Sequence, residues 1–277
     1  EEFLMREDYD VIVSTHFFGS EVVATMKRSG KLRARLITVV TDFRLHSWWV
    51  NEPTDTYVVA SDDTKDDLAR WKVAPVRVRV LGIPVEPVFA RSCDRQKLRG
   101  ALSFKDGIFT ILVIGGGFGV GPIEDIVRSA NGLSRPAQVI VICGHNQQLK
   151  KRIDDIRPNP GVTIRTFGFV DNVYEYMEGA DILISKSGGI TVSESMAKGL
   201  PMLVIAPILG QETGNSDFLV KHGAAVSIDA VPQLGGVLED LAAHPEKIAA
   251  LRANIDRIRK PNACYDIAHL AVHAARS

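Results

Sequence analysis

The strongest constraint on the fold is a series of short apolar segments that alternate with segments of helical character. In the second half of the chain, five of them are expected to be strands: 109–114, 138–143, 162–166, 182–185 and 202–205. Strands that alternate with helices form parallel sheets with right-handed crossovers. Ligands of such sheets bind at the carboxyl ends of the strands, and glycine-rich or polar turns follow several of these segments.

The first half repeats the pattern in shorter units. Its expected strands are 11–13, 36–40, 57–60 and 76–80, with helices over 19–28 and from 62 to about 71. Pro84 and Pro87 favour an extended connector, so a domain boundary is expected near residues 84–105. Beyond residue 230, helices are expected over 238–251 and 262–275. The predicted class is therefore α/β, with two domains divided at about residue 90.

The turn after the strand at 182–185 carries the clearest chemistry. Ser187, Gly188, Gly189 and Thr191 lie where this strand gives way to a helix, and Glu194 follows within that helix. Unpaired backbone N–H groups and the positive end of the helix dipole favour an anion such as a diphosphate. A carboxylate one turn further on suits the vicinal hydroxyls of a ribose. Together these features predict a nucleotide site.

A second glycine-rich turn, Gly115–Gly121, follows the strand at 109–114. Gly116 and Gly117 can let the backbone approach a phosphate closely, or can simply form a tight turn. The turn does not fit the G-x-G-x-x-G dinucleotide pattern, and it lacks the Gly-Lys-Ser/Thr ending of a Walker A loop. The next strand ends in Cys143-Gly144-His145, without the acidic residue that would hold a cofactor ribose.

Two further turns hold candidate ligand contacts. In the segment 207–215, the side chains of Gln211, Glu212 and Asn215 suit the hydroxyl groups of a sugar, and helix capping is the alternative reading. Phe169 and Val170, in the segment 167–173, can border a base or can be ordinary hydrophobic packing beside a helix cap at Asp171.

In the first half, the segment 41–49 is the candidate for catalysis. His46 or Asp42 can act as a general base or can have a structural role. Trp48 and Trp49 are either part of the core or an anchor at a lipid interface. His16, at the end of the first strand, is a weaker candidate on the same edge.

Composition excludes several classes of protein. The 277 residues carry no net charge, so no general basic field favours nucleic acid. The three cysteines are widely spaced, which predicts no metal site and a reducing compartment. The longest apolar run, near 202–209, is too short to span a bilayer. The chain opens at Glu1-Glu2-Phe3 rather than at methionine, which suggests a fragment.

Taken in order along the chain, these segments resemble the GT-B glycosyltransferases. More narrowly they resemble family 28, the group of monogalactosyldiacylglycerol synthases and bacterial processive diacylglycerol glucosyltransferases. The resemblance is carried by the following segments: 41–49, 55–61, 82–85, 115–117, 143–146, 168–170, 186–194 and 207–215. It implies two Rossmann-like domains that face a cleft: an acceptor domain at 1–90, apparently incomplete, and a UDP-sugar-binding domain at 91–260. A helix at 261–277 would return to the first domain through its apolar positions Ile267, Ala268, Leu270, Ala271 and Ala274.

The resemblance also implies an activity and residue roles. The family transfers a hexose from a UDP-sugar to a lipid with inversion and without a metal or other cofactor. This implies UDP-glucose or UDP-galactose, diacylglycerol, and a peripheral position at the cytoplasmic face of a membrane. The implied donor contacts are Gly116, Gly117, Ser187, Gly188, Gly189 and Thr191 for the diphosphate region, Phe169 and Val170 for uracil, Glu194 for ribose, Gln211, Glu212 and Asn215 for the hexose, and His145 within the same pocket.

One expected element is missing from the sequence. The family's glycine-rich loop that ends in histidine does not occur in this chain, so His46 and Asp42 are the remaining candidates for the general base. Two other functions stay open. One is a related enzyme of the same fold, such as the lipid-linked peptidoglycan GlcNAc transferase or a UDP-sugar epimerase. The other is a non-catalytic module that binds nucleotide sugars.

Overall fold

The computed structural model describes residues 2–117, 119, 121–205 and 211–276, with the side chain of Gln211 outside the description. Two compact units make up the chain. The first comprises residues 1–90, 188–193 and 260–277, and the second comprises 91–187 and 194–259. The division at residues 90 and 91 falls inside the proline-bearing connector. The short piece 188–193 groups with the first unit, which the sequence did not predict.

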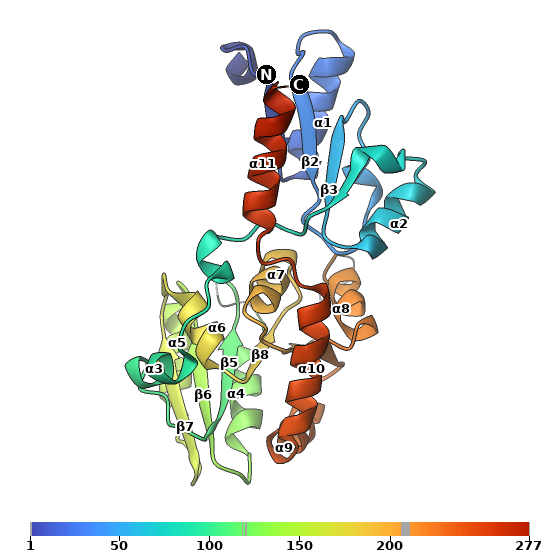
Figure 1. Ribbon diagram of the computed structural model, residues 1–277. Helices are drawn as coiled ribbons and strands as arrows, with labels where there is room; N and C mark the ends of the chain where they lie inside the picture. Colours follow the sequence, from blue (N-terminus) through green and yellow to red (C-terminus); the bar gives the residue numbers. More distant parts are fainter. Residues whose placement is uncertain (1, 118, 120, 206–210, 277) are drawn as a thin grey trace. The chain divides into compact units, whose positions relative to one another are not determined.

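The first unit is built on a parallel sheet of four strands in the order β1-β2-β3-β4 (Figure 1). The strands are β1 (Val11–Ser14), β2 (Arg35–Val39), β3 (Thr56–Val59) and β4 (Val78–Val80). The helices α1 (Phe17–Arg28) and α2 (Asp62–Arg70) alternate with them. The hydroxyl of Ser61 caps α2 by accepting the N–H of Thr64, as the sequence predicts.

Both faces of this sheet are covered. Tyr57 and Val59 of β3 pack with Trp49 and with Leu68 of α2 on one face. On the other face, Ile37, Val39 and Val58 pack against Ile267 of α11 (Ala263–Arg276). Leu270, Ala271 and Ala274 of α11 join that contact. Ala268 is exposed, so its predicted place in the contact was wrong, because it lies off the stripe formed by the other four residues.

The second unit holds a six-stranded parallel sheet in the order β10-β9-β8-β5-β6-β7. Its strands are β5 (Phe109–Ile114), β6 (Ala137–Ile142), β7 (Val162–Phe167), β8 (Ile182–Ser185), β9 (Met202–Ile205) and β10 (Ala225–Ile228). Its helices are α3 (Arg95–Ala101), α4 (Ile123–Asn131), α5 (Gln147–Asp154), α6 (Val173–Gly179), α8 (Gln211–Lys221), α9 (Leu234–Ala243) and α10 (Pro245–Ile258). Helix α7 (Gly189–Ala197) follows β8 along the chain. Strand β6 is buried along its whole length, Gln138 included, as is typical of a strand inside a parallel sheet.

Three details differ from the sequence-based expectations. The strand expected over 76–80 is confined to β4, because Pro75 begins a 3₁₀ turn that runs to Arg77. The single helix expected over 238–251 is two helices, since the chain breaks at His244 and Pro245 opens α10. The edge strand β10 was not predicted, because its four residues carry a weak alternating pattern.

Candidate functional site

The turns that follow β5, β6, β7 and β8 all lie at one edge of the second sheet. Hydrogen-bonded pairing sets β8 beside β5, β5 beside β6, and β6 beside β7, all in parallel. The hydroxyl of Ser185 fixes two of the strand ends by donating to the carbonyl oxygen of Ile114 over 2.9 Å. The carboxyl edge that the sequence singled out therefore carries the glycine turn, His145, Phe169 and the turn that contains Ser187.

The glycine turn after β5 folds closely over the turn after β6. His145 donates its backbone N–H to the carbonyl oxygen of Gly117 over 2.9 Å. A side chain at Gly144 has no room, since its Cβ would lie 2.3 Å from the oxygen of Gly117, and its φ is +58°. In contrast, Gly116 and Gly117 are exposed and a Cβ at either would meet nothing within 4 Å. These two glycines thus present open backbone at the edge of the sheet.

The side chains of His145 and Phe169 form a flat aromatic pair at the ends of β6 and β7. Their rings are stacked with centroids 4.7 Å apart and an interplanar angle of 9°. Phe169 is 61% exposed even though it is a large apolar side chain. Val170 beside it is half-buried. An exposed aromatic face of this kind can border a planar base, and the hydrophobic-packing alternative does not account for such exposure.

The turn after β8 is tied to the start of α8 by two hydrogen bonds, which we call the Ser187 clamp. The hydroxyl of Ser187 donates to the carbonyl oxygen of Glu212 over 2.6 Å. The amide Nδ2 of Asn215 donates to the carbonyl oxygen of Ser187 over 2.9 Å. Ser187 and Asn215 are 0% and 1% exposed. The clamp thus brings together two of the turns that the sequence predicted to act jointly.

The clamp also separates the residues of the predicted hexose group. Asn215 points inward to support the backbone of the neighbouring turn, while Glu212 and Glu194 are half-buried. Residues 207–210 of that predicted segment, and the side chain of Gln211, lie outside the described residues. Assignment of Gln211, Glu212 and Asn215 to a hexose therefore stays a prediction.

Helix α7 begins directly after the clamp. Val192 donates its N–H to the carbonyl oxygen of Gly188, which makes Gly188 the residue at the helix entrance. The carbonyl oxygen of Gly189 accepts from the hydroxyl of Ser193. A Cβ at Gly188 would meet nothing within 4 Å, and Thr191 is half-buried in the first turn. The start of a helix presents N–H groups without intrahelical partners, which suits an anion.

In the first unit, the segment after β2 brings His46 and Asp42 together. His46 Nε2 lies 3.9 Å from Asp42 Oδ2, and the same oxygen accepts the indole N–H of Trp49 over 3.1 Å. Partial burial lowers the pKa of His46, and the nearby Asp42 carboxylate opposes this without reversing it. The imidazole is therefore neutral at pH 7, the form that can accept a proton.

The two tryptophans have different surroundings. Trp49 is 1% exposed and belongs to the core, whereas Trp48 is 67% exposed. Trp49 is therefore a core residue, while an anchoring role at a lipid interface stays a prediction for the exposed Trp48. Phe17, which the sequence analysis missed, contacts both tryptophan rings and the His46 ring at centroid distances of 5.2–5.8 Å. Phe17 follows β1, and β1 pairs in parallel with β2, so its position in the sequence could have indicated that it lies near the segment after β2.

His16 has a structural role in the described structure. Its Nδ1 accepts the N–H of Phe18 over 3.2 Å, which caps the start of α1. Among the described residues, no group of three or more His, Cys, Asp or Glu side chains could hold a metal ion. None of the described helices has the length and apolar character needed to cross a membrane.

Comparison with known proteins places this geometry in a family. Residues 110–265 match the glycosyltransferase family 28 C-terminal domain, and residues 1–85 match the monogalactosyldiacylglycerol (MGDG) synthase family. The chain is 29% identical over 264 residues to a processive diacylglycerol beta-glucosyltransferase of Bacillus licheniformis, covering 95% of this chain and 68% of that protein. It is 30% identical over 277 residues to a probable monogalactosyldiacylglycerol synthase 2 of Oryza sativa subsp. japonica, covering 95% of this chain and 58% of that one. The chain thus spans about two thirds or less of these relatives.

Solved structures agree on the fold. MurG of Acinetobacter baumannii superimposes with a TM-score of 0.72 at 15% identity, over 95% of this chain and 73% of that one. HepE of Anabaena, in complex with UDP, gives a TM-score of 0.64 at 15% identity, over 95% and 78%. The resemblance inferred from the sequence is confirmed. With two parallel α/β sheets and these matches, the chain has the GT-B fold and belongs to glycosyltransferase family 28.

Proposed function

We propose that this chain takes part in transferring a hexose from UDP-glucose or UDP-galactose to diacylglycerol, with inversion, at the cytoplasmic face of a membrane. The names of the relatives support the class of reaction and of acceptor. The observation that carries the proposal is the Ser187 clamp, because it holds the turn at the start of α7 next to the start of α8. Diphosphate and hexose are neighbours in a UDP-sugar, so their binding turns must be neighbours too.

The chemistry follows from this arrangement. The acceptor hydroxyl oxygen bonds to the anomeric carbon while the bond from that carbon to the diphosphate oxygen breaks. Negative charge then gathers on the departing UDP, and the N–H groups of Gly188 and Gly189 at the start of α7 are suited to stabilise it. His46, neutral at pH 7 and oriented by Asp42, is proposed to accept the proton of the acceptor hydroxyl. A single displacement of this kind inverts the anomeric configuration.

The ribose contact is tested by binding. Glu194→Ala is expected to weaken UDP binding by about 1–3 kcal/mol, roughly 5- to 150-fold, because the ribose hydroxyls lose a charged acceptor. Isothermal titration calorimetry measures this directly. Glu246→Ala, which removes an exposed carboxylate in the first turn of α10, serves as the matched control. Equal UDP affinity in the wild type and Glu194→Ala would remove the assignment of Glu194.

The reaction is tested by product analysis. Vesicles that contain diacylglycerol are incubated with the protein and with labelled UDP-glucose or UDP-galactose, and glycolipid is separated by thin-layer chromatography. Label in a glycolipid from one donor supports the proposal and identifies the sugar. In a separate incubation with UDP-GlcNAc, conversion to its epimer indicates an epimerase instead. Saturable UDP binding without any transfer indicates a nucleotide-sugar-binding module.

A further inference from the structure

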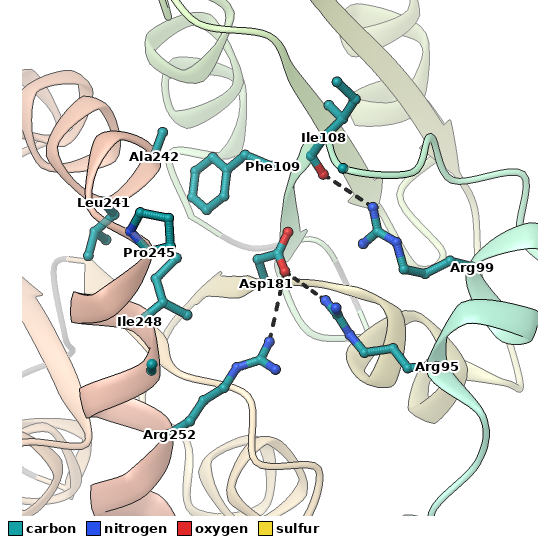
Figure 2. Close-up of a pocket in the computed structure, with 12 residues that line it drawn as sticks. Arg95, Arg99, Ile108, Phe109, Asp181, Leu241, Ala242, Pro245, Ile248 and Arg252 are labelled. Carbon is teal, nitrogen blue, oxygen red and sulfur yellow. Dashed lines mark hydrogen bonds and ion pairs between the residues drawn. The ribbon is translucent and has the colours of Figure 1, made fainter.

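A cavity of about 420 Å³ opens in the second unit, at the end of the sheet opposite the candidate donor turns (Figure 2). Phe109 at the start of β5 and Asp181 just before β8 lie on its wall. Arg95 and Arg99 reach it from α3, and Arg252 reaches it from α10. The proposed transfer reaction uses none of these residues.

Two of the three guanidinium groups each donate four hydrogen bonds to the protein. Arg95 donates to the carbonyl oxygens of residues 178, 179 and 180, and to Asp181 Oδ1 over 2.7 Å. Arg99 donates to the carbonyl oxygens of residues 105, 108 and 179, and to the hydroxyl of Thr110. Their role is to satisfy backbone oxygens where α6 and the loop before β5 end.

The third guanidinium group, that of Arg252, makes fewer hydrogen bonds than the other two. Its Nη2 donates to the carbonyl oxygen of Ala180 over 3.1 Å and lies 3.9 Å from Asp181 Oδ1, which Arg95 already holds. Its Nε is buried and has no hydrogen-bond partner in the structure. A buried donor without a hydrogen-bond partner is unfavourable. Burial lowers the pKa of Arg252 and the neighbouring Arg95 charge adds to this, while the carboxylates of Asp181, Glu178 and Asp256 oppose it.

The charges of the cavity do not cancel. Three guanidinium groups face it, and Asp181 is the one carboxylate among the residues that line it, all of which are described. Positive charge is therefore in excess among the lining residues, while Glu178 and Asp256 act on Arg252 from outside the lining. Nε itself is buried, but the Arg252 side chain is 34% exposed, so a carboxylate or phosphate in the cavity would pair with the accessible part of the guanidinium group and reduce the repulsion between the arginines.

The remainder of the cavity wall is apolar. The ring of Phe109 faces the side chains of Leu241, Pro245 and Ile248 from the α9–α10 junction (Figure 2). A volume of this size falls in the range of pockets that hold small organic molecules. An inorganic anion would fill only the arginine end and would leave the apolar wall without contacts.

We propose that this cavity binds a small amphipathic anion, with a carboxylate or phosphate head on Arg252 and a short apolar body against α10. The site is separate from the candidate UDP site, because it lies at the amino ends of β5 and β8 while the donor turns follow their carboxyl ends. Binding of such an anion and binding of UDP are therefore expected not to exclude each other.

The test uses the whole chain with octyl phosphate and octanoate as probes, measured by isothermal titration calorimetry. Wild-type protein is expected to bind at least one of the two saturably, with inorganic phosphate at least tenfold weaker and octylammonium not bound. Whichever octyl anion binds more tightly identifies the head group. Arg252→Gln is expected to weaken binding at least tenfold, while Arg257→Gln, an exposed arginine on the same helix, leaves it unchanged.

Two further measurements test the shape of the cavity and its independence from the UDP site. Ala249→Leu adds bulk to the wall of the cavity from α10 and keeps Arg252, so it is expected to weaken octyl anion binding while thermal unfolding stays near the wild type. Saturating UDP is expected to leave octyl anion binding unchanged, and competition by UDP would overturn the separate site. Equal binding by wild type and Arg252→Gln, or no saturable binding of either octyl anion, would overturn the proposal even if UDP binds as expected.

Discussion

The Ser187 clamp gives a prediction whose size follows from the structure. Asn215→Ala removes the donor to the carbonyl oxygen of Ser187, and because Ser187 is 0% exposed, that oxygen is left buried without this bond. The expected loss is about 1–3 kcal/mol of local stability. Ser187→Ala removes the donor to the carbonyl oxygen of Glu212, which is half-buried and partly reached by water, so the expected loss is about 0.5–1.5 kcal/mol.

The double variant is the sharper measurement. Both hydrogen bonds join the turn after β8 to the start of α8, so after one is lost the other contributes less to the stability of this junction. The combined loss is expected to fall short of the sum by at least ~0.5 kcal/mol. Hydrogen exchange of the amides in β8 and α8 reports this local stability. Asp217→Ala, an exposed position on α8, is the control that should leave exchange unchanged.

The same variants connect the clamp to the donor site. If the clamp shapes the start of α7, each variant should also weaken UDP binding, and Asp217→Ala should not. Additive losses within ~0.3 kcal/mol, together with unchanged UDP affinity, would refute the reasoning. Slower exchange or tighter UDP binding in either single variant would refute it as well.

Two further predictions concern His46 and the glycine turn. The pKa of His46 is lowered below 6.5 in the folded protein, so as pH falls the unfolded state binds more protons than the folded state. The first unit should therefore lose stability as pH drops through the folded pKa. Asp42→Asn removes a charge that raises this pKa, so the variant should show a still lower pKa of His46 in an NMR titration. A folded pKa that rises in Asp42→Asn would contradict this account. Gly144→Ala should destabilise the protein and weaken UDP binding, because the added Cβ would lie 2.3 Å from the oxygen of Gly117. The control is Gly107→Ala, where φ is a similar +68° but a Cβ has open space. This variant should lower the free energy of unfolding by only about 1–2 kcal/mol, measured by thermal unfolding, and should leave UDP binding unchanged. Equal effects of the two glycine variants would show that the close approach does not matter.

The second sheet was predictable because most of its strands contain a run of apolar residues, as buried parallel strands do. Strands such as β6, with no exposed residue, stand out in the sequence as continuous Val and Ile runs. The predictions were wrong where the hydrophobic pattern is weak, as in β10, or where it continues across a break in the backbone, as between α9 and α10. β10 is short and partly exposed at the sheet edge, and the helical pattern continues across His244 and Pro245 although the backbone does not.

The candidate site was predictable at the level of turns but not of side-chain directions. The order of strands with polar turns placed Ser187, His145 and Phe169 on one edge, since parallel strands share their carboxyl ends. Nothing in the sequence shows that Asn215 turns inward to a backbone oxygen, because an amide can bind a sugar or a carbonyl group equally well. The sequence could not show either that Arg252 has an unpaired Nε beside a cavity, since its neighbours on α3 and before β8 are distant in the sequence.

The packing of α11 on the first sheet has a consequence for synthesis on the ribosome. β2 and β3 are made before the second unit, but the apolar face formed by Ile37, Val39 and Val58 is covered by a helix made only after that unit. Until then that face is open to misplaced contacts. The second unit can therefore complete its core first, although it is the later one in the sequence. Until α11 is made, β2 and β3 are expected to need protection from such contacts.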